Sequence, residues 1–363
     1  MSTIKRNPSA AALATPAAPA RHRRGHGRAT LQDVAQQAGV TAITVSRYLR
    51  APEVVAAETG QRIEDALLAT GYVPNKQAGQ LASGHSKMVA AIIPSIANSI
   101  FAETVQGLSD GLQEAGYELL LASTGYSRER EQAQVRAVLG WFPSALVVTG
   151  RHHSDAALAL LRAAQAAHTP VIEIWDQQPR DLSNGFAQVG FNHAEVGAAM
   201  AAHLLQRGHR RLAYVDSGVG EDFRAHERGK GFVAAARAAG ADVRHLTAQP
   251  GDAFDAGRHA LALLLDGHPD RPVTAIALAN DNFACGALLE AQQRGLDIPA
   301  QIAIMGFGDF EIGRQLRPAL TTIRPPRYEI GRRAAALLLA ALQDGAPLTP
   351  QSLPWQLIPR AST

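Results

Sequence analysis

A stretch near the N-terminus, "TLQDVAQQAGVTAITVSRYL" (residues 30–49), carries side chains that could read the edges of base pairs. Helical spacing places five residues, small and apolar near the start and cationic further along, on one side of a helix: Ala42, Ile43, Ser46, Arg47 and Arg50. Short residues permit close approach to the major groove, and an arginine can donate to both O6 and N7 of guanine. We therefore predict a recognition helix for DNA; the alternative is a helical bundle with an ordinary solvated face.

Two short helices joined by a tight turn would position this face. Thr30 and Thr41 can cap the two helices with their hydroxyl groups, and Gly39 has the backbone freedom that the turn requires. Helical spacing predicts the residues that point inward: Leu31, Val34, Ala35 and Ala38 in the first helix, Val45, Tyr48 and Leu49 in the second, and Ile63, Ala66 and Leu67 in a third that ends at Gly71. The N-terminal part is therefore expected to be an all-α helix-turn-helix.

Polar groups of a different kind occur later, where short apolar runs end. "HERGKGF" contains Arg228 and Lys230, and "LANDNFACG" contains Asn280 and Asp281. Apolar runs alternate with amphipathic helices in "MVAAIIPSI", "YELLLAST", "ALVVTG" and "PVIEIWD", and the pattern restarts after about residue 193 with "RRLAYVDS", "TAIALAND" and "IAIMGFGD". This alternation predicts parallel sheets with covered faces, and the restart predicts two lobes. Ligands bind at the carboxyl ends of parallel strands, so these polar groups are candidates for binding a small molecule.

Motifs for catalysis or cofactor binding are scarce. "SGVGEDF" places Gly218 and Gly220 after a strand, but the third glycine of a dinucleotide-binding motif is missing. His152 and His153 are adjacent, and neighbouring residues rarely chelate one metal ion. The single cysteine, Cys285, cannot form an intrachain disulfide, which favours a reducing compartment. We therefore expect no cofactor, no metal and no enzymatic activity.

Charge is distributed unevenly along the 363 residues. Up to Lys87 there are 11 Lys and Arg against 5 Asp and Glu, whereas the remainder has 24 basic and 27 acidic residues, so a polyanion would be attracted to the front of the chain. Residues 1–28, rich in Ala, Pro and Arg, predict a disordered basic arm rather than a secretory signal. No apolar run approaches the roughly 18 residues of a membrane helix, so we expect no membrane association.

The predicted helix-turn-helix is followed by "YVPNKQAGQLASGHSK" (residues 72–87). Together the two stretches closely resemble the LacI/GalR family of bacterial transcription regulators. The resemblance implies a helix-turn-helix domain over residues 29–74, a hinge helix and linker over 75–87, and an effector-binding and dimerisation domain over 88–363. This last domain would be α/β, with two lobes of parallel sheet like those of periplasmic binding proteins.

The resemblance also implies roles at the DNA. It places three groups of residues: Ala42, Ile43 and Arg47 at base edges, Thr41, Ser46 and Asn75 at phosphates, and Leu81 as a wedge between base pairs in the minor groove. Gly79 departs from the family pattern, because a glycine inside the hinge helix costs about 1 kcal/mol relative to alanine. We therefore expect the hinge to be unfolded until DNA is present; for Leu81 the alternative is a linker leucine without a special role.

A ligand in the cleft between the lobes is a further implication of the resemblance. In the family, an arginine at the position of Arg228 grips the ligand, Asn280 bonds it and Asp281 supports the cleft; the alternatives are a surface ion pair for Arg228 and a helix cap for Asn280. The expected effector-binding residues are Phe101, Arg151, Asp176, Arg228, Lys230, Asn280 and Asp281. No catalytic residue is expected.

A second departure bears on the class of ligand. Sugar repressors of the family usually have "G-Y-D-D" where this chain has "GFGDFEIG" (residues 306–313), so Gly308 replaces the first aspartate. Loss of a carboxylate acceptor, with Arg228 and Lys230 kept and Arg151 as a third positive group, favours an anion. The stretches "STGYSREREQ", "EIWD", "VGFN" and "GFGDFEIG" look most like the gluconate-repressor branch, which implies a sugar acid.

Taken together, these features predict a cytoplasmic, homodimeric transcriptional repressor whose affinity for a palindromic operator is switched by gluconate or a related hexonate. Ligand would close the lobes, so that the paired hinges no longer fit the minor groove. Two alternatives are a regulator of the same family that responds to a neutral sugar or a corepressor, and an enzyme that acts on sugar acids. No heptad repeat follows the last helix, so no tetramerising coiled coil is expected.

Overall fold

The computed structural model describes residues 29–74, 86–96, 99–179, 183–249, 251–267 and 270–363. The chain divides into two compact units, Met1–Gly84 and His85–Thr363. The sequence analysis named three residues in the predicted hinge that lie outside the described residues: Asn75, Gly79 and Leu81. Among the described residues, no helix combines the length and the apolar character needed to cross a bilayer.

The described part of the N-terminal unit is helical. Its elements are α1 (Leu31–Ala38), α2 (Ala42–Arg50), the short 3₁₀ helix η1 (Pro52–Val54) and α3 (Ala57–Thr70). The side chain of Thr30 caps α1 and forms a reciprocal pair with Asp33, and Gly39 ends α1 at a positive φ of 65°. The predicted third helix begins at Ala57 and ends before Gly71, which also has positive φ. The helix-turn-helix is thus confirmed.

The C-terminal unit contains two sheets, each of six strands. Lobe 1 has the strand order β11-β5-β4-β3-β1-β2, and lobe 2 has the order β12-β10-β9-β8-β6-β7. The strands are β1 (Met88–Ile93), β2 (Glu118–Ser123), β3 (Ala145–Thr149), β4 (Val171–Ile174), β5 (Ala187–Gly190), β6 (Arg211–Asp216), β7 (Asp242–Thr247), β8 (Ala275–Leu278), β9 (Ala303–Phe307), β10 (Thr321–Arg324), β11 (Gln351–Ser352) and β12 (Gln356–Ile358). All neighbouring strands are parallel except β10 and β12. The predicted two-lobed α/β fold is therefore confirmed.

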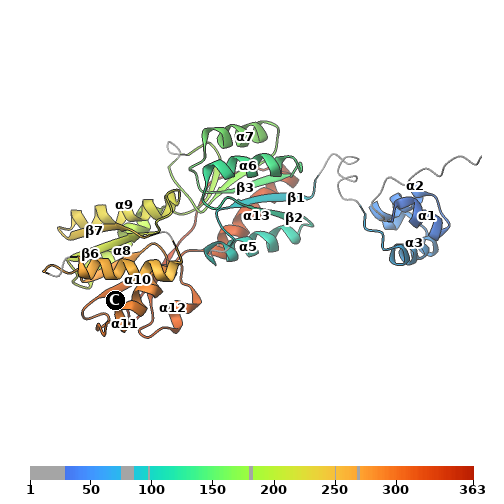
Figure 1. Ribbon diagram of the computed structural model, residues 1–363. Helices are drawn as coiled ribbons and strands as arrows, with labels where there is room; N and C mark the ends of the chain where they lie inside the picture. The colour runs from blue at the N-terminus through green and yellow to red at the C-terminus, as the bar shows by residue number, and fades with distance from the viewer. Residues whose placement is uncertain (1–28, 75–85, 97–98, 180–182, 250, 268–269) are drawn as a thin grey trace, which may run out of the picture. The chain divides into compact units, whose positions relative to one another are not determined.

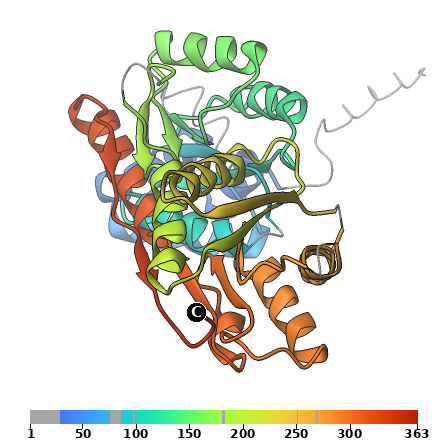
Figure 2. The same ribbon diagram turned by 90° about the vertical axis from the view of Figure 1, so that its left-hand side faces the viewer.

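Helices cover both faces of each sheet, as Figures 1 and 2 show. In lobe 1, α5 packs against α13 and α6 packs against α7; in lobe 2, α8 packs against α9 and α10 against α11. The helices are α5 (Ala102–Gln113), α6 (Arg128–Leu139), α7 (Asp155–Ala166), α8 (His193–Gln206), α9 (Phe223–Ala238), α10 (Ala253–Asp266), α11 (Asp281–Gln293), α12 (Glu311–Gln315) and α13 (Arg327–Asp344), with the 3₁₀ helix η2 (Ser99–Phe101) before α5. Burial on both faces explains why the central strands are continuous apolar runs.

The path of the chain differs from the simple restart that the sequence pattern predicts. After β5 the chain enters lobe 2 and builds it up to β10, but α13 and β11 return to lobe 1 before β12 completes lobe 2. The return is held by apolar packing, because Ile330, Ala334 and Leu338 of α13 are buried in the same cluster as Leu108 and Leu112 of α5. Neither lobe is therefore a continuous stretch of sequence.

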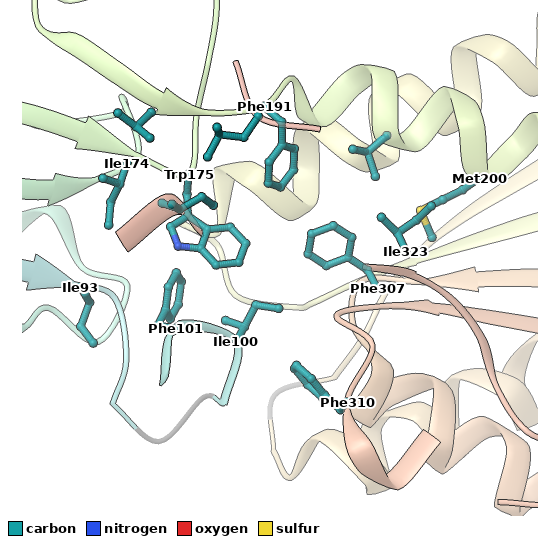
Figure 3. Packing of buried hydrophobic residues seen from close by; sticks show 14 of the residues in the cluster. Ile93, Ile100, Phe101, Ile174, Trp175, Phe191, Met200, Phe307, Phe310 and Ile323 are labelled. Atoms are coloured by element: carbon teal, nitrogen blue, oxygen red, sulfur yellow. The ribbon is translucent and has the colours of Figure 1, made fainter. Parts of the chain in front are cut away.

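One buried apolar cluster extends through both lobes. It includes Ile93 and Ile174 from lobe 1 and Met200, Phe307 and Ile323 from lobe 2. Figure 3 shows the rings of Phe101, Trp175, Phe191 and Phe307 gathered where the two lobes meet. This aromatic packing forms one wall of the cleft described below.

Candidate functional site

The outward face of α2 combines exposed and half-buried side chains. Ile43 is 70% exposed, and Arg47 and Arg50 are exposed as well, whereas Ala42 and Ser46 are half-buried. Arg47 makes no side-chain hydrogen bond or ion pair with any described residue, while the Nε of Arg50 donates to the carbonyl of Ser46 at 3.2 Å. An apolar side chain and an uncommitted guanidinium thus stand on one surface, the combination that a major groove can accommodate.

Contacts from α3 hold α2 at its angle to α1. The guanidinium of Arg62 donates to the carbonyl oxygens of Ala38 and Gly39, which lie at the end of α1. The hydroxyl of Tyr48 donates to Glu64 at 2.5 Å. A side chain at Gly60 would clash with that tyrosine ring, because its Cβ would lie 2.9 Å from Cε2. The helical pattern predicted the buried face, but these polar supports from α3 were not predicted.

Two adjoining cavities lie between lobe 1 and lobe 2. The inner cavity, with about 350 Å³ of empty space, is lined by Ile100, Phe101, Tyr126, Trp175, His193, Asp222, Arg224, Arg228, Ala279, Asn280 and Phe307. The outer cavity, with about 360 Å³, is lined by Pro94, Thr124, Tyr126, Ser127, Arg128, Glu131, Thr149, Gly150, His152, Glu221, Phe223 and Arg224. Tyr126 and Arg224 line both, so the cavities are contiguous.

Arg228 is fixed at the inner cavity by several contacts. Its Nη2 donates to the carbonyl of Ala279 at 2.8 Å, and its Nη1 lies 3.1 Å from Nδ1 of His193. The guanidinium stacks 3.9 Å from the centre of the Phe307 ring. Its Nε is buried without a hydrogen-bond partner among the described residues and is therefore available to a ligand.

His193 supports this arrangement in its neutral form. Burial, reinforced by Arg228 and Arg224, lowers the pKa of His193 well below its ordinary value. A neutral ring can accept from Arg228 at Nδ1 while Nε2–H donates to the carbonyl of Trp175 at 2.8 Å. The two contacts together indicate the Nε2–H tautomer and leave the positive charge on the arginine.

Arg224 is a functional candidate that the sequence interpretation missed. It is only 9% exposed, lines both cavities and makes no hydrogen bond to a described residue. Its guanidinium lies 5.8 Å from the centre of the Phe101 ring. The available signal was its spacing, because Arg224 precedes Arg228 by four residues and therefore shares its face of α9.

Asp176, at the end of β4, is the lobe 1 counterpart of these arginines. Both of its carboxylate oxygens are buried without hydrogen-bond partners among the described residues. Burial raises the pKa of Asp176 to about 6, although nearby Arg224 opposes the rise. The group is not among the lining residues of either cavity, but a Cβ on Gly150, which lines the outer one, would lie 3.2 Å from its Oδ2.

Phe101 and Asn280 both line the inner cavity, as a ligand contact would require. The ring of Phe101 packs edge-on against Trp175 with centroids 5.3 Å apart. Asn280 is also the N-cap of α11, where Oδ1 accepts from the backbone N–H of Asn282 and Phe283. The cap occupies its oxygen, so the amide Nδ2 is the group that a ligand could use.

Asp281 supports the cleft without lining either cavity. Its Oδ2 accepts from the backbone N–H of Phe310 at 2.7 Å and its Oδ1 accepts from Thr322 at 2.6 Å. Burial raises the pKa of Asp281 to about 6, against the effect of these two hydrogen bonds. Gly308 belongs to the same loop at a φ of 137°, and a Cβ there would lie 2.7 Å from the Phe310 ring.

The remaining carboxylate of this loop is bound within the protein. Asp309 accepts hydrogen bonds from Arg314, Arg324 and Arg360, which hold its pKa at about 2 despite burial. Neither Gly308 nor Asp309 lines a cavity. The loop therefore supplies no acidic acceptor to the inner cavity, in keeping with the sequence-based expectation of an anionic ligand.

Two predicted effector residues, Arg151 and Lys230, lie outside both cavities. Arg151 pairs with Glu227 across the cleft, because Glu227 precedes Arg228 on α9 and faces lobe 1. Lys230 is exposed, since two residues along a helix turn the side chain to the far side from Arg228. A direct contact of these two residues with the ligand stays a prediction, and the lining of the two cavities does not support it.

Several ion pairs connect the lobes across the cleft. Glu227 of α9 also accepts from Nε2 of His152 at 3.0 Å, and Arg128 of α6 pairs with Glu221 at 2.9 Å. These contacts exist only while the two cavity walls are close together. They link occupancy of the cleft to the relative position of the lobes.

Comparisons with known proteins agree with this geometry. Residues 30–75 match the family described as "Bacterial regulatory proteins, lacI family", and residues 201–363 match a periplasmic binding protein-like domain. The chain is 40% identical to the HTH-type transcriptional regulator GntR of Pseudomonas aeruginosa over 319 residues, 87% of this chain and 90% of that protein.

Solved structures extend the likeness to three dimensions. A LacI family transcriptional regulator from Silicibacter pomeroyi matches with a TM-score of 0.84 and 34% identity, covering 92% of this chain and 99% of that one. The transcription regulator GntR from Chromobacterium violaceum matches with a TM-score of 0.68 and 32% identity, covering 76% of this chain and 98% of that one. All three relatives are named as transcriptional regulators.

Proposed function

The chain belongs to the LacI family of bacterial transcriptional regulators, and we propose that it is a gluconate-responsive repressor that leaves its operator when ligand fills the inner cavity. Like its named relatives it is a DNA-binding regulator and not an enzyme. One observation carries the choice of effector: two buried guanidinium groups, Arg224 and Arg228, line one small cavity. Such a pair is suited to bind a carboxylate.

The DNA-binding half of the proposal rests on α2. We assign Ala42, Ile43 and Arg47 to base edges in the major groove, and Thr41 and Ser46 to phosphates. Asn75 and Leu81 keep the phosphate and minor-groove roles that the family resemblance implies. A homodimer in the cytoplasm would present two such helices to a palindromic operator.

The effector half rests on the division of charges within the inner cavity. The carboxylate of the sugar acid binds Arg224 and the free Nε of Arg228. Hydroxyl groups of the ligand bind the amide of Asn280, and the aromatic wall at Phe101 covers the carbon chain. Asp176 lines neither cavity and acts through its charge beside Arg224. Gluconate, with one carboxylate and a row of hydroxyls, has the required groups.

The switch acts through the relative position of the lobes. Ligand bridges Arg224 and Arg228 on lobe 2 and the aromatic wall at Phe101 on lobe 1, and so favours the closed cleft with its cross-lobe ion pairs. The coupling to DNA is no larger than the difference in ligand affinity between the two states, and it is reciprocal: operator DNA weakens gluconate binding by the same factor.

Fluorescence anisotropy tests the proposal directly. A labelled fragment from upstream of this protein's own gene is titrated with the full chain at fixed salt, alone and with gluconate or glucose. We expect specific binding that gluconate releases and glucose leaves intact. Release by glucose alone would establish the neutral-sugar alternative, tighter binding with gluconate would establish a corepressor, and turnover of gluconate would establish an enzyme.

A further inference from the structure

The outer cavity is left empty when one hexonate occupies the inner cavity. The two cavities are similar in extent, with about 360 and 350 Å³ of empty space that is partly open to solvent. The two meet at Tyr126 and Arg224. The cleft therefore continues beyond the proposed site of the sugar acid, toward Glu131 and Phe223.

A buried carboxylate with an unused oxygen lines the outer cavity. Glu131 in the first turn of α6 is 7% exposed, and its Oε1 lies 2.7 Å from Nδ1 of His153. Its Oε2 is buried without a partner among the described residues. A buried, unpartnered oxygen of this kind carries a free-energy penalty that a donor from a ligand would remove.

The carboxylate is held in place from the side opposite the cavity. His153 also lies 3.3 Å from Glu173, whose other hydrogen bonds come from Asn184 at 2.7 Å and Gln188 at 2.6 Å. The two glutamates raise the pKa of His153 to about 9, so the ring is an imidazolium between them. This network fixes Glu131 and leaves Oε2 as its one unsatisfied acceptor site.

The surrounding charges disfavour a cationic ligand at this acceptor. Arg128 and Arg224 line the same cavity, and the imidazolium of His153 lies directly behind Glu131. Arg128 is itself neutralised by Glu221 at 2.9 Å. A neutral hydroxyl donor meets none of this repulsion, and so it suits Oε2 better than an ammonium group does.

An aromatic surface completes the outer cavity. Phe223 at the start of α9 stacks on His152 with centroids 4.5 Å apart, and the guanidinium of Arg128 lies 5.4 Å from the same ring. A flat apolar surface beside a carboxylate acceptor suits a sugar ring, which has both hydroxyl groups and an apolar face.

We propose that the outer cavity is a subsite for a glycosyl unit, with Glu131 and Phe223 as its contacts, so that the preferred effector is a sugar acid carrying a second sugar residue. The inference rests on the proposed function, since the acid group still binds Arg224 and Arg228. The cationic inner cavity takes the acid end, and the outer cavity takes the neutral end. Arg224, shared by both cavities, lies at the junction of the two units.

Calorimetric titration of the full chain distinguishes the two ligand lengths. Gluconate is compared with maltobionate, cellobionate and lactobionate, which are gluconate units carrying one further hexose, and with maltose as a neutral control. We expect at least one of the three longer acids to bind about tenfold more tightly than gluconate, and maltose not to bind. If all three bind no more tightly than gluconate, the subsite does not exist.

Variants test whether Glu131 makes the difference. Glu131→Gln should remove the tenfold advantage of the longer acid and leave gluconate affinity unchanged, whereas Glu129→Gln, an exposed position on the same helix, should change neither. Phe223→Leu gives a second test that leaves the Glu131 network intact, with the same selective loss. Equal weakening of gluconate by either variant would overturn the subsite. Failure of every sugar acid to bind would instead refute the proposed function.

Discussion

The helix that faces DNA and the cleft that faces the effector are built in opposite ways. Ile43 and Arg47 stand exposed on a nine-residue helix, and Arg47 has no side-chain hydrogen bond or ion pair with a described residue. Arg224 and Arg228 of α9 and Asp176 after β4 are buried, and these two segments are far apart in sequence. A surface for a macromolecule is thus a local property of one helix, whereas a pocket for a small molecule exists only after two lobes have assembled.

The difference also concerns how charges are held. The guanidinium of Arg47 makes no ion pair with a described residue, and we propose that DNA provides its counter-charge. Arg228 is fixed by His193 and Ala279 before any ligand arrives. Fixed groups give up little conformational entropy on binding, so the cleft should discriminate among ligands by geometry, whereas α2 should gain much of its affinity from electrostatic attraction.

Removal of a cleft arginine should cause the largest loss of gluconate affinity and should leave operator affinity unchanged. Arg224→Met is expected to weaken gluconate binding by about a hundredfold, because a buried charge-assisted contact contributes about 1.5–3 kcal/mol. Operator affinity without ligand should stay within twofold in anisotropy titrations. Lys230→Met, on the exposed side of the same helix, is the matched control and should behave as the unaltered protein; an unchanged response of Arg224→Met would mean that this guanidinium does not bind the effector.

Substitution on α2 should weaken operator binding and leave gluconate binding unchanged. Arg47→Ala is expected to cost about 1–3 kcal/mol of specific operator affinity, with loss of discrimination at one base pair and no change in gluconate affinity. Titrations on the operator and on random DNA of equal length distinguish a contact with a base from a contact with a phosphate. If both affinities fall equally, Arg47 contacts phosphate and not a base.

Asp176 should make the stability of the protein depend on pH. Because the pKa of this carboxyl is raised to about 6 in the folded protein, the native state binds the proton more tightly than the unfolded chain, and ionisation destabilises the fold as pH rises from about 4 to 6. Asp176→Asn should therefore add about 1–2 kcal/mol to the free energy of unfolding above pH 6 and almost nothing near pH 4. Denaturant titrations at the two pH values measure this; an equal gain at both would exclude ionisation as the cause.

Loss of the exposed ion pair between Arg128 and Glu221 should have the smallest effect on gluconate affinity. Arg128 and Glu221 are 49% and 33% exposed, and such pairs contribute about 0–1 kcal/mol. Arg128→Ala should therefore reduce gluconate affinity by no more than about fivefold, and added salt should reduce the difference between the variant and the unaltered protein further. A hundredfold loss would show that Arg128 belongs to the effector site and not to its rim.

The same contrast explains which features the sequence predicted. The faces of α1, α2 and α3 follow from helical spacing, and the strands of both lobes follow from apolar runs, because both patterns are local. Arg151 and Lys230 were assigned to the ligand because they are cations near strand or helix ends. Only the assembled cleft shows that Arg151 is neutralised by Glu227 and that Lys230 faces solvent.

Contacts between segments that are far apart in sequence were the hardest to predict. Glu131 and His153 are separated by more than twenty residues and meet only because α6 packs beside the end of β3. "SGVGEDF" shows the converse, a suggestive motif with a structural explanation: a Cβ on Gly218 would lie 2.1 Å from the carbonyl oxygen of Ala248. In both cases the neighbour that explains the residue comes from a segment distant in sequence.

The return of α13 and β11 to lobe 1 has a consequence for how the protein is made. The strands from β1 to β4 leave the ribosome long before Arg327–Asp344 is synthesised, and at about 5–20 residues per second the delay is roughly 10–30 s. During that interval the face of the sheet destined for α13, and the α5 surface around Leu108 and Leu112, remain uncovered. The nascent chain thus carries an exposed, aggregation-prone apolar surface for most of its synthesis. A chain that stops short of α13 would keep that surface exposed permanently.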